Sequence, residues 1–395
     1  MNRAAGALLG LALAARLLLV FLTAPGPDAG PVPYFNDEPA HLNYVRYLDA
    51  AGRLPVQTGS VRDQFDQAEF EYYQPPLYYL LAQPLYDLGR SLFPAGGLYG
   101  ARLASVILSL GGLAVLYPAV RRFSGRRDLA AMVLLLGALS SIPLRFSTLV
   151  TNDSLLFALA CLYFAVTLEA LGGERDWRLV VTGALAAAAG LWTKASFLLV
   201  LPFFPLALLA SSESLRSRGI KALTALILPL AAILPWYLRN LDLYGRMLPL
   251  SVGFGPPQPL TLENAPERLG LLANYFTRTL IFPYDGWWGG FPGYLVFPLA
   301  ALAFAGFVIM GAAVLWRGRR TGFWIFLGAG AAVTAGYLGV NWCYPQGEAR
   351  TLMPALPFLL TLAALGASRL AGRSRERAWL GLGLWIVLPW VTLLF

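Results

Sequence analysis

Apolar segments of membrane-spanning length recur along the chain and constrain its fold more than any other feature. The chain is 57% hydrophobic and 13% charged, whereas a soluble domain typically has about a quarter charged residues. The apolar runs do not alternate with polar residues as strands would, and helices satisfy their own backbone hydrogen bonds in lipid. We therefore predict an all-α, polytopic membrane protein, one integral membrane domain over residues 1–395. Segments of roughly 20 apolar residues predict about 11 transmembrane helices, at residues 4–23, 98–120, 128–147, 153–171, 178–192, 195–211, 221–238, 292–315, 321–340, 352–370 and 378–394.

The positive charge of the chain follows the predicted topology. The formal net charge is +9, and Arg and Lys gather in alternate short loops, such as residues 121–127. Cytoplasmic loops of membrane proteins carry this bias, so the N-terminus is expected to be cytoplasmic. The charge thus indicates a multi-pass cell-membrane protein and does not indicate a nucleic-acid partner.

The first apolar segment has two interpretations. Arg3 followed by an apolar run is also typical of a cleaved signal peptide. Arg16 interrupts the apolar run, however, and no clear Ala-x-Ala cleavage site follows. A retained helix is therefore favoured.

Two long loops are predicted on the outer side. The first covers residues 24–97 and includes an apolar stretch, 75–93, that carries Pro84 and Arg90. Counting this stretch as a span would reverse the sidedness of the later loops, so we predict an interfacial or re-entrant helix. The second loop, 240–291, is rich in Pro, Gly and aromatic residues and is a candidate lid.

Two adjacent carboxylates, Asp37 and Glu38, lie in the first outer loop. Two like charges close together near a membrane cost free energy, so residues that carry them often have a functional role. Acidic residues at a helix N-terminus are, however, also stabilised by the helix dipole. His41 follows Asp37 by one helical turn and is expected to orient the carboxylate. One Asp and one His form an incomplete metal site, so no metal ligands and no cofactor are predicted; a divalent metal is compatible but not indicated.

Further polar residues lie near the outer ends of later spans. Asp153 either caps a helix or lines a site. Lys194, one of two lysines in the chain, lies in a short break between apolar runs and is suited to a lipid phosphate. Arg239 and Arg350 are candidates to clamp a phosphate. Two further outer arginines are expected to contact lipid headgroups: Arg102 and Arg145.

These residues occur in an order that resembles GT-C glycosyltransferases, in the branch of protein O-mannosyltransferases and the lipid A aminoarabinose transferase. The motifs are Asp37-Glu38, Gln74-Pro75-Pro76-Leu77, Asn152-Asp153, Thr193-Lys194 and Arg350…Pro354. The resemblance covers residues 1–240 well and 284–360 more loosely. Arg350-Thr351 departs from the Arg-Tyr pair of the family. No single motif is specific, but their order and common sidedness are.

The resemblance implies an inverting glycosyltransferase at the outer face of a bacterial cell membrane. The donor would be a polyprenyl-phosphate sugar, and the acceptor a hydroxyl of a lipid, glycan or protein. Asp37 would be the catalytic base, beside Glu38 and Asp153. The candidate substrate-binding residues are Lys194, Arg350, Arg239, His41, Gln74 and Tyr78. The main alternative is a flippase or transporter of polyprenyl-linked lipids; a scaffolding protein would leave Asp37-Glu38 unexplained.

Overall fold

The computed structural model is helical wherever it describes the chain, and it contains no strand in those residues. The described residues are 3–23, 37–58, 70–93, 95–174, 176–210, 213–250, 252, 257–281, 291–345, 347–371 and 383. The predicted all-α fold is therefore confirmed for this part of the chain. Parts of both predicted outer loops fall outside it: residues 24–36, 59–69 and 94 of the first, and 251, 253–256 and 282–290 of the second.

Each element is a helix that follows an apolar run or an amphipathic stretch of the sequence. The α-helices are α1 (Arg3–Leu22), α2 (Glu38–Ala51), α3 (Leu77–Leu92), α4 (Gly96–Ser124), α5 (Arg127–Leu139), α6 (Ser141–Phe146), α7 (Asp153–Gly172), α8 (Trp177–Leu191), α9 (Phe203–Leu209), α10 (Leu215–Tyr244), α12 (Ala265–Ile281), α13 (Phe291–Gly318), α14 (Arg320–Cys343) and α15 (Leu356–Leu370). Two 3₁₀ helices, η1 (Ala195–Leu199) and η2 (Ala349–Ala355), precede α9 and α15.

Seven helical segments of the described chain are long and apolar enough to cross a membrane: α1, α4, α7, α10, α13, α14 and the continuous η2–α15 run. Two shorter apolar segments, α8 and the η1–α9 pair, accompany them. The first ten predicted spans all coincide with helices. The last, 378–394, lies almost wholly outside the described residues, so the predicted total of about 11 is not established.

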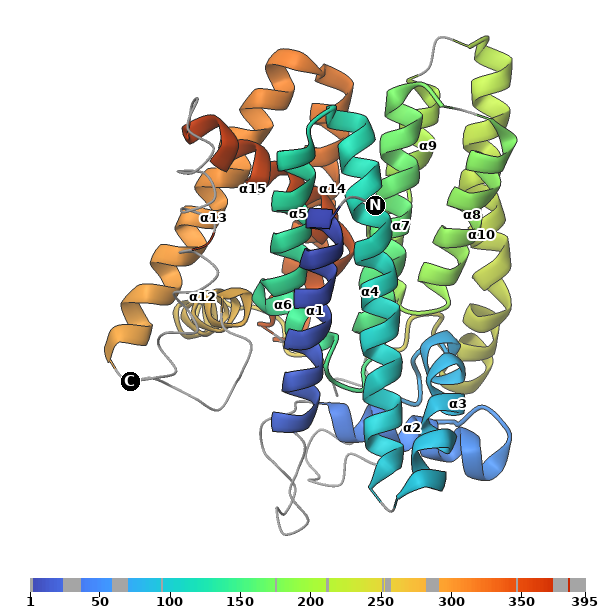
Figure 1. Ribbon diagram of the computed structural model, residues 1–395. Coiled ribbons are helices and arrows are strands. Elements are labelled where there is room, and N and C mark those ends of the chain that lie inside the picture. Colours follow the sequence, from blue (N-terminus) through green and yellow to red (C-terminus); the bar gives the residue numbers. More distant parts are fainter. Residues whose placement is uncertain are drawn as a thin grey trace.

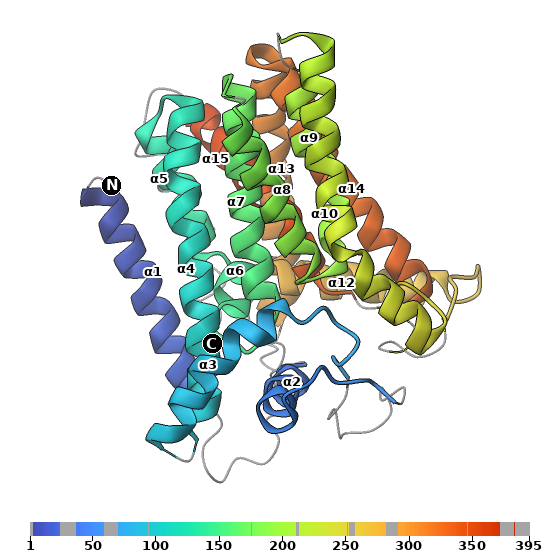
Figure 2. The ribbon, with the colours of Figure 1, turned by 90° about the vertical axis from the view of Figure 1, so that its right-hand side faces the viewer.

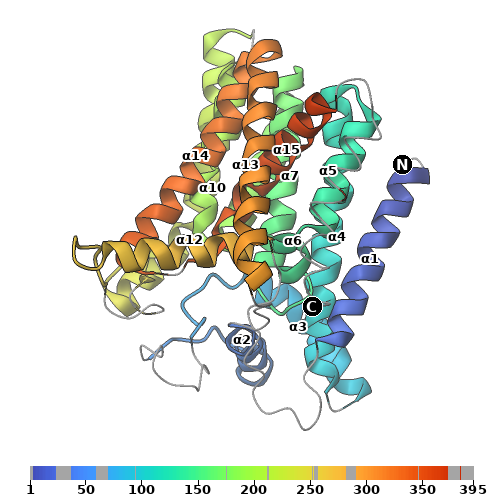
Figure 3. The ribbon, with the colours of Figure 1, turned by 90° about the vertical axis from the view of Figure 1, so that its left-hand side faces the viewer.

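The long helices run side by side, and α2, α3 and α12 lie at one end of this bundle (Figure 1). The end of α1, the start of α4 and the start of α7 all lie at this end. Figure 2 shows α2 just beyond it, with α3 slanting between α2 and α4. Figure 3 shows α12 lying crosswise over the same end. The two long loops predicted from the sequence therefore contribute helices to a single end of the bundle.

Glycines allow α3 to approach α4 closely. A Cβ added to Gly100 would lie 1.9 Å from the carbonyl oxygen of Leu85, and one added to Gly96 would lie equally close to that of Gly89. No side chain fits at such distances, so these glycines set the depth at which α3 packs. These contacts fix the second half of α3 against α4, and Tyr78 and Tyr79 are buried in its first turn.

Candidate active site

Four charged residues from distant parts of the chain meet at the end of the bundle that carries α2 and α12. Asp37 immediately precedes α2, and Asp153 begins α7. Lys194 lies in the break between α8 and η1, and Arg350 lies in η2. Both carboxylates are buried, whereas Lys194 and Arg350 keep 22% and 16% of their side chains exposed. The cations are thus the part of this cluster that a ligand reaches from solvent.

Ion pairs join these residues. Arg350 NH1 lies 2.7 Å from Asp37 Oδ2 and 3.7 Å from Asp153 Oδ2. Lys194 Nζ donates to Asp153 Oδ1 at 2.7 Å. Arg350 Nε also pairs with Glu348. Asp153 is therefore bracketed by two cations, and Arg350 links it to Asp37.

The chain around Asp153 and Lys194 is held by local hydrogen bonds. The side-chain amide of Asn152 donates to the carbonyl of Thr193 at 3.3 Å. The Asp153 amide donates to Thr151 Oγ1 at 3.3 Å, as expected where a short polar side chain serves the first turn of a helix. The two motifs Asn152-Asp153 and Thr193-Lys194 are therefore joined directly.

The charge environment keeps Asp37 ionised. Burial alone would raise its pKa, but Arg350, His41 and Lys194 together hold the pKa of this carboxyl well below its usual range. An opposite charge within a few ångströms favours the charged form in this way. Asp37 is therefore a carboxylate at neutral pH.

Glu38 has entirely different surroundings from its neighbour Asp37. Its two oxygens accept from Arg102 Nε at 2.8 Å and NH2 at 2.7 Å, and Oε1 also accepts from the amide of Val150. Arg102 is fully buried and also donates to the carbonyl of Val20 in α1. The predicted headgroup contact for Arg102 is therefore wrong. The sequence shows that Arg102 lies near a helix end but not that a carboxylate from another segment reaches it.

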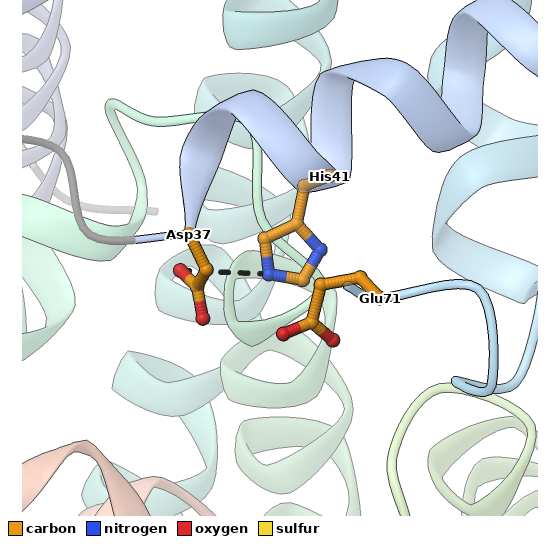
Figure 4. Close-up of side chains that lie close together, drawn as sticks. All are labelled: Asp37, His41 and Glu71. Carbon is orange, nitrogen blue, oxygen red and sulfur yellow. Dashed lines mark ion pairs between the residues drawn. The ribbon is translucent and has the colours of Figure 1, made fainter. Parts of the chain in front are cut away.

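His41 and Glu71 extend the cluster beyond Asp37 (Figure 4). His41 Nε2 lies 3.7 Å from Asp37 Oδ1, and the imidazole Nδ1 lies 2.7 Å from the Tyr79 hydroxyl. One ligand atom each from Asp37, His41 and Glu71 lies within 4.8 Å of the others, and all three residues are buried. Glu71 thus adds a further buried acid beside Asp37 and His41.

The charges of Asp37, His41 and Glu71 act on one another and shift the pKa values of His41 and Glu71. Burial would lower the pKa of His41, but Glu71 and Asp37 raise it above its usual value. Burial, together with the Asp37 charge, raises the pKa of Glu71 to about 7. His41 and Glu71 therefore each keep a proton to higher pH than the free side chains would.

The Gln74-Pro75-Pro76-Leu77-Tyr78 element forms the wall between α2 and α4. The Tyr78 hydroxyl lies 2.8 Å from Ser105 Oγ and accepts from the Thr151 amide at 3.0 Å. Gln74 donates to the Tyr73 hydroxyl at 3.1 Å and is buried. Both candidates are thus next to the site, where they bind other protein groups.

Arg239 and Arg145 make contacts that the sequence does not predict. Arg239 donates to the carbonyl of Pro55 at 2.7 Å and lies over the Trp236 ring, so its contacts join α10 to the segment after α2 rather than to the carboxylates. Arg145 is buried, with 3% exposure, beside the Phe146 ring. The predicted headgroup contact for Arg145 is wrong because α6 turns it into the protein.

Sequence reasoning missed Glu71 and the role of Glu348. Glu71 lies outside the quoted motifs, and its partners Asp37 and His41 come from another segment. The available signal was its place, three residues before Gln74 in a loop already predicted to carry the site.

This helical membrane bundle, with its polar residues gathered at one end, has the fold of the GT-C glycosyltransferases. Residues 74–238 match the family model described as "Dolichyl-phosphate-mannose-protein mannosyltransferase". The chain is similar to the crystal structure of ArnT from Cupriavidus metallidurans, at 20% identity and a TM-score of 0.57, over 96% of this chain and 63% of that one. The same protein bound to undecaprenyl phosphate gives 18% identity and a TM-score of 0.56, over 95% of this chain and 62% of that one.

The archaeal oligosaccharyltransferase AglB from Archaeoglobus fulgidus, in complex with an inhibitory peptide and a dolichol-phosphate, is similar too. Its TM-score is 0.57 at 12% identity, over 98% of this chain and 55% of that one. No curated protein matches the chain. The resemblance predicted from the sequence is therefore confirmed in fold and in the matched segment, and the chain spans less than two thirds of each of these solved proteins.

Proposed function

We propose that the protein is an inverting glycosyltransferase that moves a sugar from a polyprenyl-phosphate donor to a hydroxyl acceptor at the outer face of the membrane. One observation carries the proposal: Asp37, Asp153, Lys194 and Arg350 come from four separate segments and join in one ion-pair network. The likeness to ArnT and AglB supports the donor class, because solved structures of those proteins contain undecaprenyl phosphate and dolichol-phosphate.

In this reaction the acceptor hydroxyl attacks the anomeric carbon from the face opposite the phosphate. A bond forms between the acceptor oxygen and that carbon, and the bond from the carbon to the phosphate oxygen breaks. Asp37 takes the hydroxyl proton as general base. The bonding electrons leave with the polyprenyl phosphate, and the sugar configuration inverts.

Lys194 and Arg350 would hold the leaving phosphate. Both are partly exposed, and each pairs with a carboxylate. Arginine and lysine bind phosphate through charge-assisted hydrogen bonds that strengthen as negative charge develops.

A consequence of this arrangement is that donor binding would tune the base. With Arg350 beside it, Asp37 has a lowered pKa and is a weak base. A phosphate that draws Arg350 and Lys194 toward itself would remove part of this stabilisation and raise the pKa of Asp37. Proton acceptance would then be strongest when the donor is in place.

Glu38 would position Asp37 rather than react. Arg102 occupies both of its oxygens, so Glu38 anchors the first turn of α2 to α4 and α1. The α12 helix, crosswise at the same end in Figure 3, would cover the site as part of the proposed 240–291 lid.

Release of polyprenyl phosphate tests the proposal without requiring a known acceptor. Purified protein in lipid nanodiscs is supplied with undecaprenyl-phosphate sugars of several kinds and a membrane extract as acceptor source. We expect one of these donors to yield undecaprenyl phosphate and a sugar-bearing acceptor. If the intact donor instead crosses the bilayer of protein-containing vesicles with its sugar retained, the flippase alternative is correct.

A further inference from the structure

Exposed arginines gather at the end of the bundle opposite the candidate active site. Figure 1 shows the turn from α4 to α5, the turn from α13 to α14 and the end of α15 at this opposite end. We infer that the exposed arginines of these three places form a basic surface that binds the headgroup of an anionic phospholipid, in the membrane leaflet away from the site. The arginines of the basic surface are Arg127, Arg317, Arg319, Arg320 and Arg369.

Direct contacts join the three places. The Arg319 guanidinium lies over the ring of Phe123, near the end of α4, with its Cζ 4.4 Å from the ring centroid. Arg126, in the turn before α5, donates to Ser368 Oγ at 2.7 Å. Ser368 directly precedes Arg369 in α15. The chain around the turn from α4 to α5 thus contacts both other places, so the arginines belong to one surface.

The charges of the basic surface are not neutralised by acidic residues. None of its arginines has an ion pair or a side-chain hydrogen bond within the described part of the chain. The neighbouring Arg122 and Arg126, by contrast, pair with Glu169 and Asp128. Arginine binds phosphate through charge-assisted hydrogen bonds, often two at a time. The unpaired guanidinium groups therefore suit a phosphate-bearing ligand.

Aromatic rings orient two of these guanidinium groups. Arg319 lies over Phe123, and Arg320 lies over the Trp316 ring with its Cζ 5.3 Å from the ring centroid. A guanidinium stacked on a ring keeps the N–H groups along its edge available for an anion. These two arginines are therefore held in place before a phosphate binds.

Two exposed tryptophans beside the arginines favour a lipid as the source of the phosphate. Trp316 is 42% exposed and Trp324 is 59% exposed, and their rings pack edge to face with centroids 5.8 Å apart. Tryptophan is enriched at the headgroup level of membranes, because its ring is apolar and its N–H is polar. The helices that carry the two residues, α13 and α14, are both long enough to cross a membrane. Basic surfaces at this depth bind anionic lipids such as cardiolipin.

Lipid binding is measured on the full chain in detergent by native mass spectrometry, without donor or acceptor, so its outcome is independent of sugar transfer. The probes are cardiolipin, which carries two phosphates, and phosphatidylcholine, whose headgroup has no net charge. Arg317→Gln combined with Arg320→Gln should weaken cardiolipin binding at least about tenfold and leave phosphatidylcholine binding unchanged. A second variant, Arg127→Gln combined with Arg369→Gln, removes two charges elsewhere on the basic surface and should also weaken cardiolipin binding.

Arg178→Gln combined with Arg216→Gln is the matched control. It removes two exposed arginines at the same end of the bundle, at the starts of α8 and α10, and should bind cardiolipin as the wild type does. Melting temperatures first establish that each variant is folded. Lost affinity in either surface variant, with the control unchanged, supports the basic surface.

Three results would overturn the inference. Unchanged cardiolipin affinity in both surface variants would remove the arginines from any lipid site. An equal loss in the control would show an effect of net charge alone. Displacement of cardiolipin by inorganic phosphate at constant ionic strength would show that the surface binds a small anion instead of a lipid.

Discussion

Arg350 forms a 2.7 Å ion pair with Asp37, although one residue lies near the end of the chain and the other near its start. The contact joins the η2 helix to the entrance of α2 and also places Arg350 3.7 Å from Asp153. A single guanidinium thus holds together the two carboxylates on which the proposed chemistry depends.

Neutralising Lys194 or Arg350 should chiefly weaken binding of the donor. A hydrogen bond to a charged group contributes about 1.5–3 kcal/mol, so Lys194→Met and Arg350→Gln should each raise the half-saturating concentration of donor about tenfold or more. The measurement is donor titration at saturating acceptor. Arg46→Gln is the control, because Arg46 is exposed on α2 and donates to the nearby Asn43 side chain. Unchanged donor dependence in both site variants would remove these cations from the phosphate site.

Loss of the Glu38 charge should destabilise the fold. In Glu38→Gln the fully buried Arg102 loses its carboxylate, and breaking a buried ion pair costs about 3–5 kcal/mol. Thermal unfolding in detergent should show a clear fall in melting temperature. Asp49→Asn removes a pair in which Arg90 is 56% exposed, and such surface pairs contribute about 1 kcal/mol or less. Equal melting temperatures for the two variants would show that Glu38 is not a structural anchor.

The site should face the outside of the cell. The positive-inside pattern places residue 124 in the cytoplasm and α3 outside. In protein without Cys161 and Cys343, a cysteine at Ser91 should react with an impermeant reagent in intact cells, whereas one at Ser124 should react only after permeabilisation. The reverse pattern would invert the topology.

The sequence predicts the helices of this protein well because each follows from a local property. A run of about 20 apolar residues is sufficient to indicate a span, and α4, α7 and α10 all form where such runs occur. The segment around Leu77–Leu92 was also predicted as a helix apart from the spans, because Pro84 and Arg90 interrupt its apolar character.

The site is predicted only in part, because its partnerships are made by tertiary packing. Asp37, Asp153, Lys194 and Arg350 were singled out by residue type and position near helix ends, and they do meet. The roles of Arg102 and Glu71 depend on segments far away in the sequence, and no spacing rule connects them to Glu38 or His41. The contact of Arg239 with the carbonyl of Pro55, in a distant segment, has no local signal either, and the phosphate-binding role of Arg239 stays a prediction.

Single-turnover sugar transfer in Asp37→Asn tests the central claim most directly. The amide keeps the shape of the side chain but accepts no proton, so the rate at saturating donor should fall by about 10²–10⁴-fold. Polyprenyl-phosphate binding and melting temperature should change little by comparison. A variant that binds donor and transfers sugar at the wild-type rate would contradict the account and assign proton acceptance to another group.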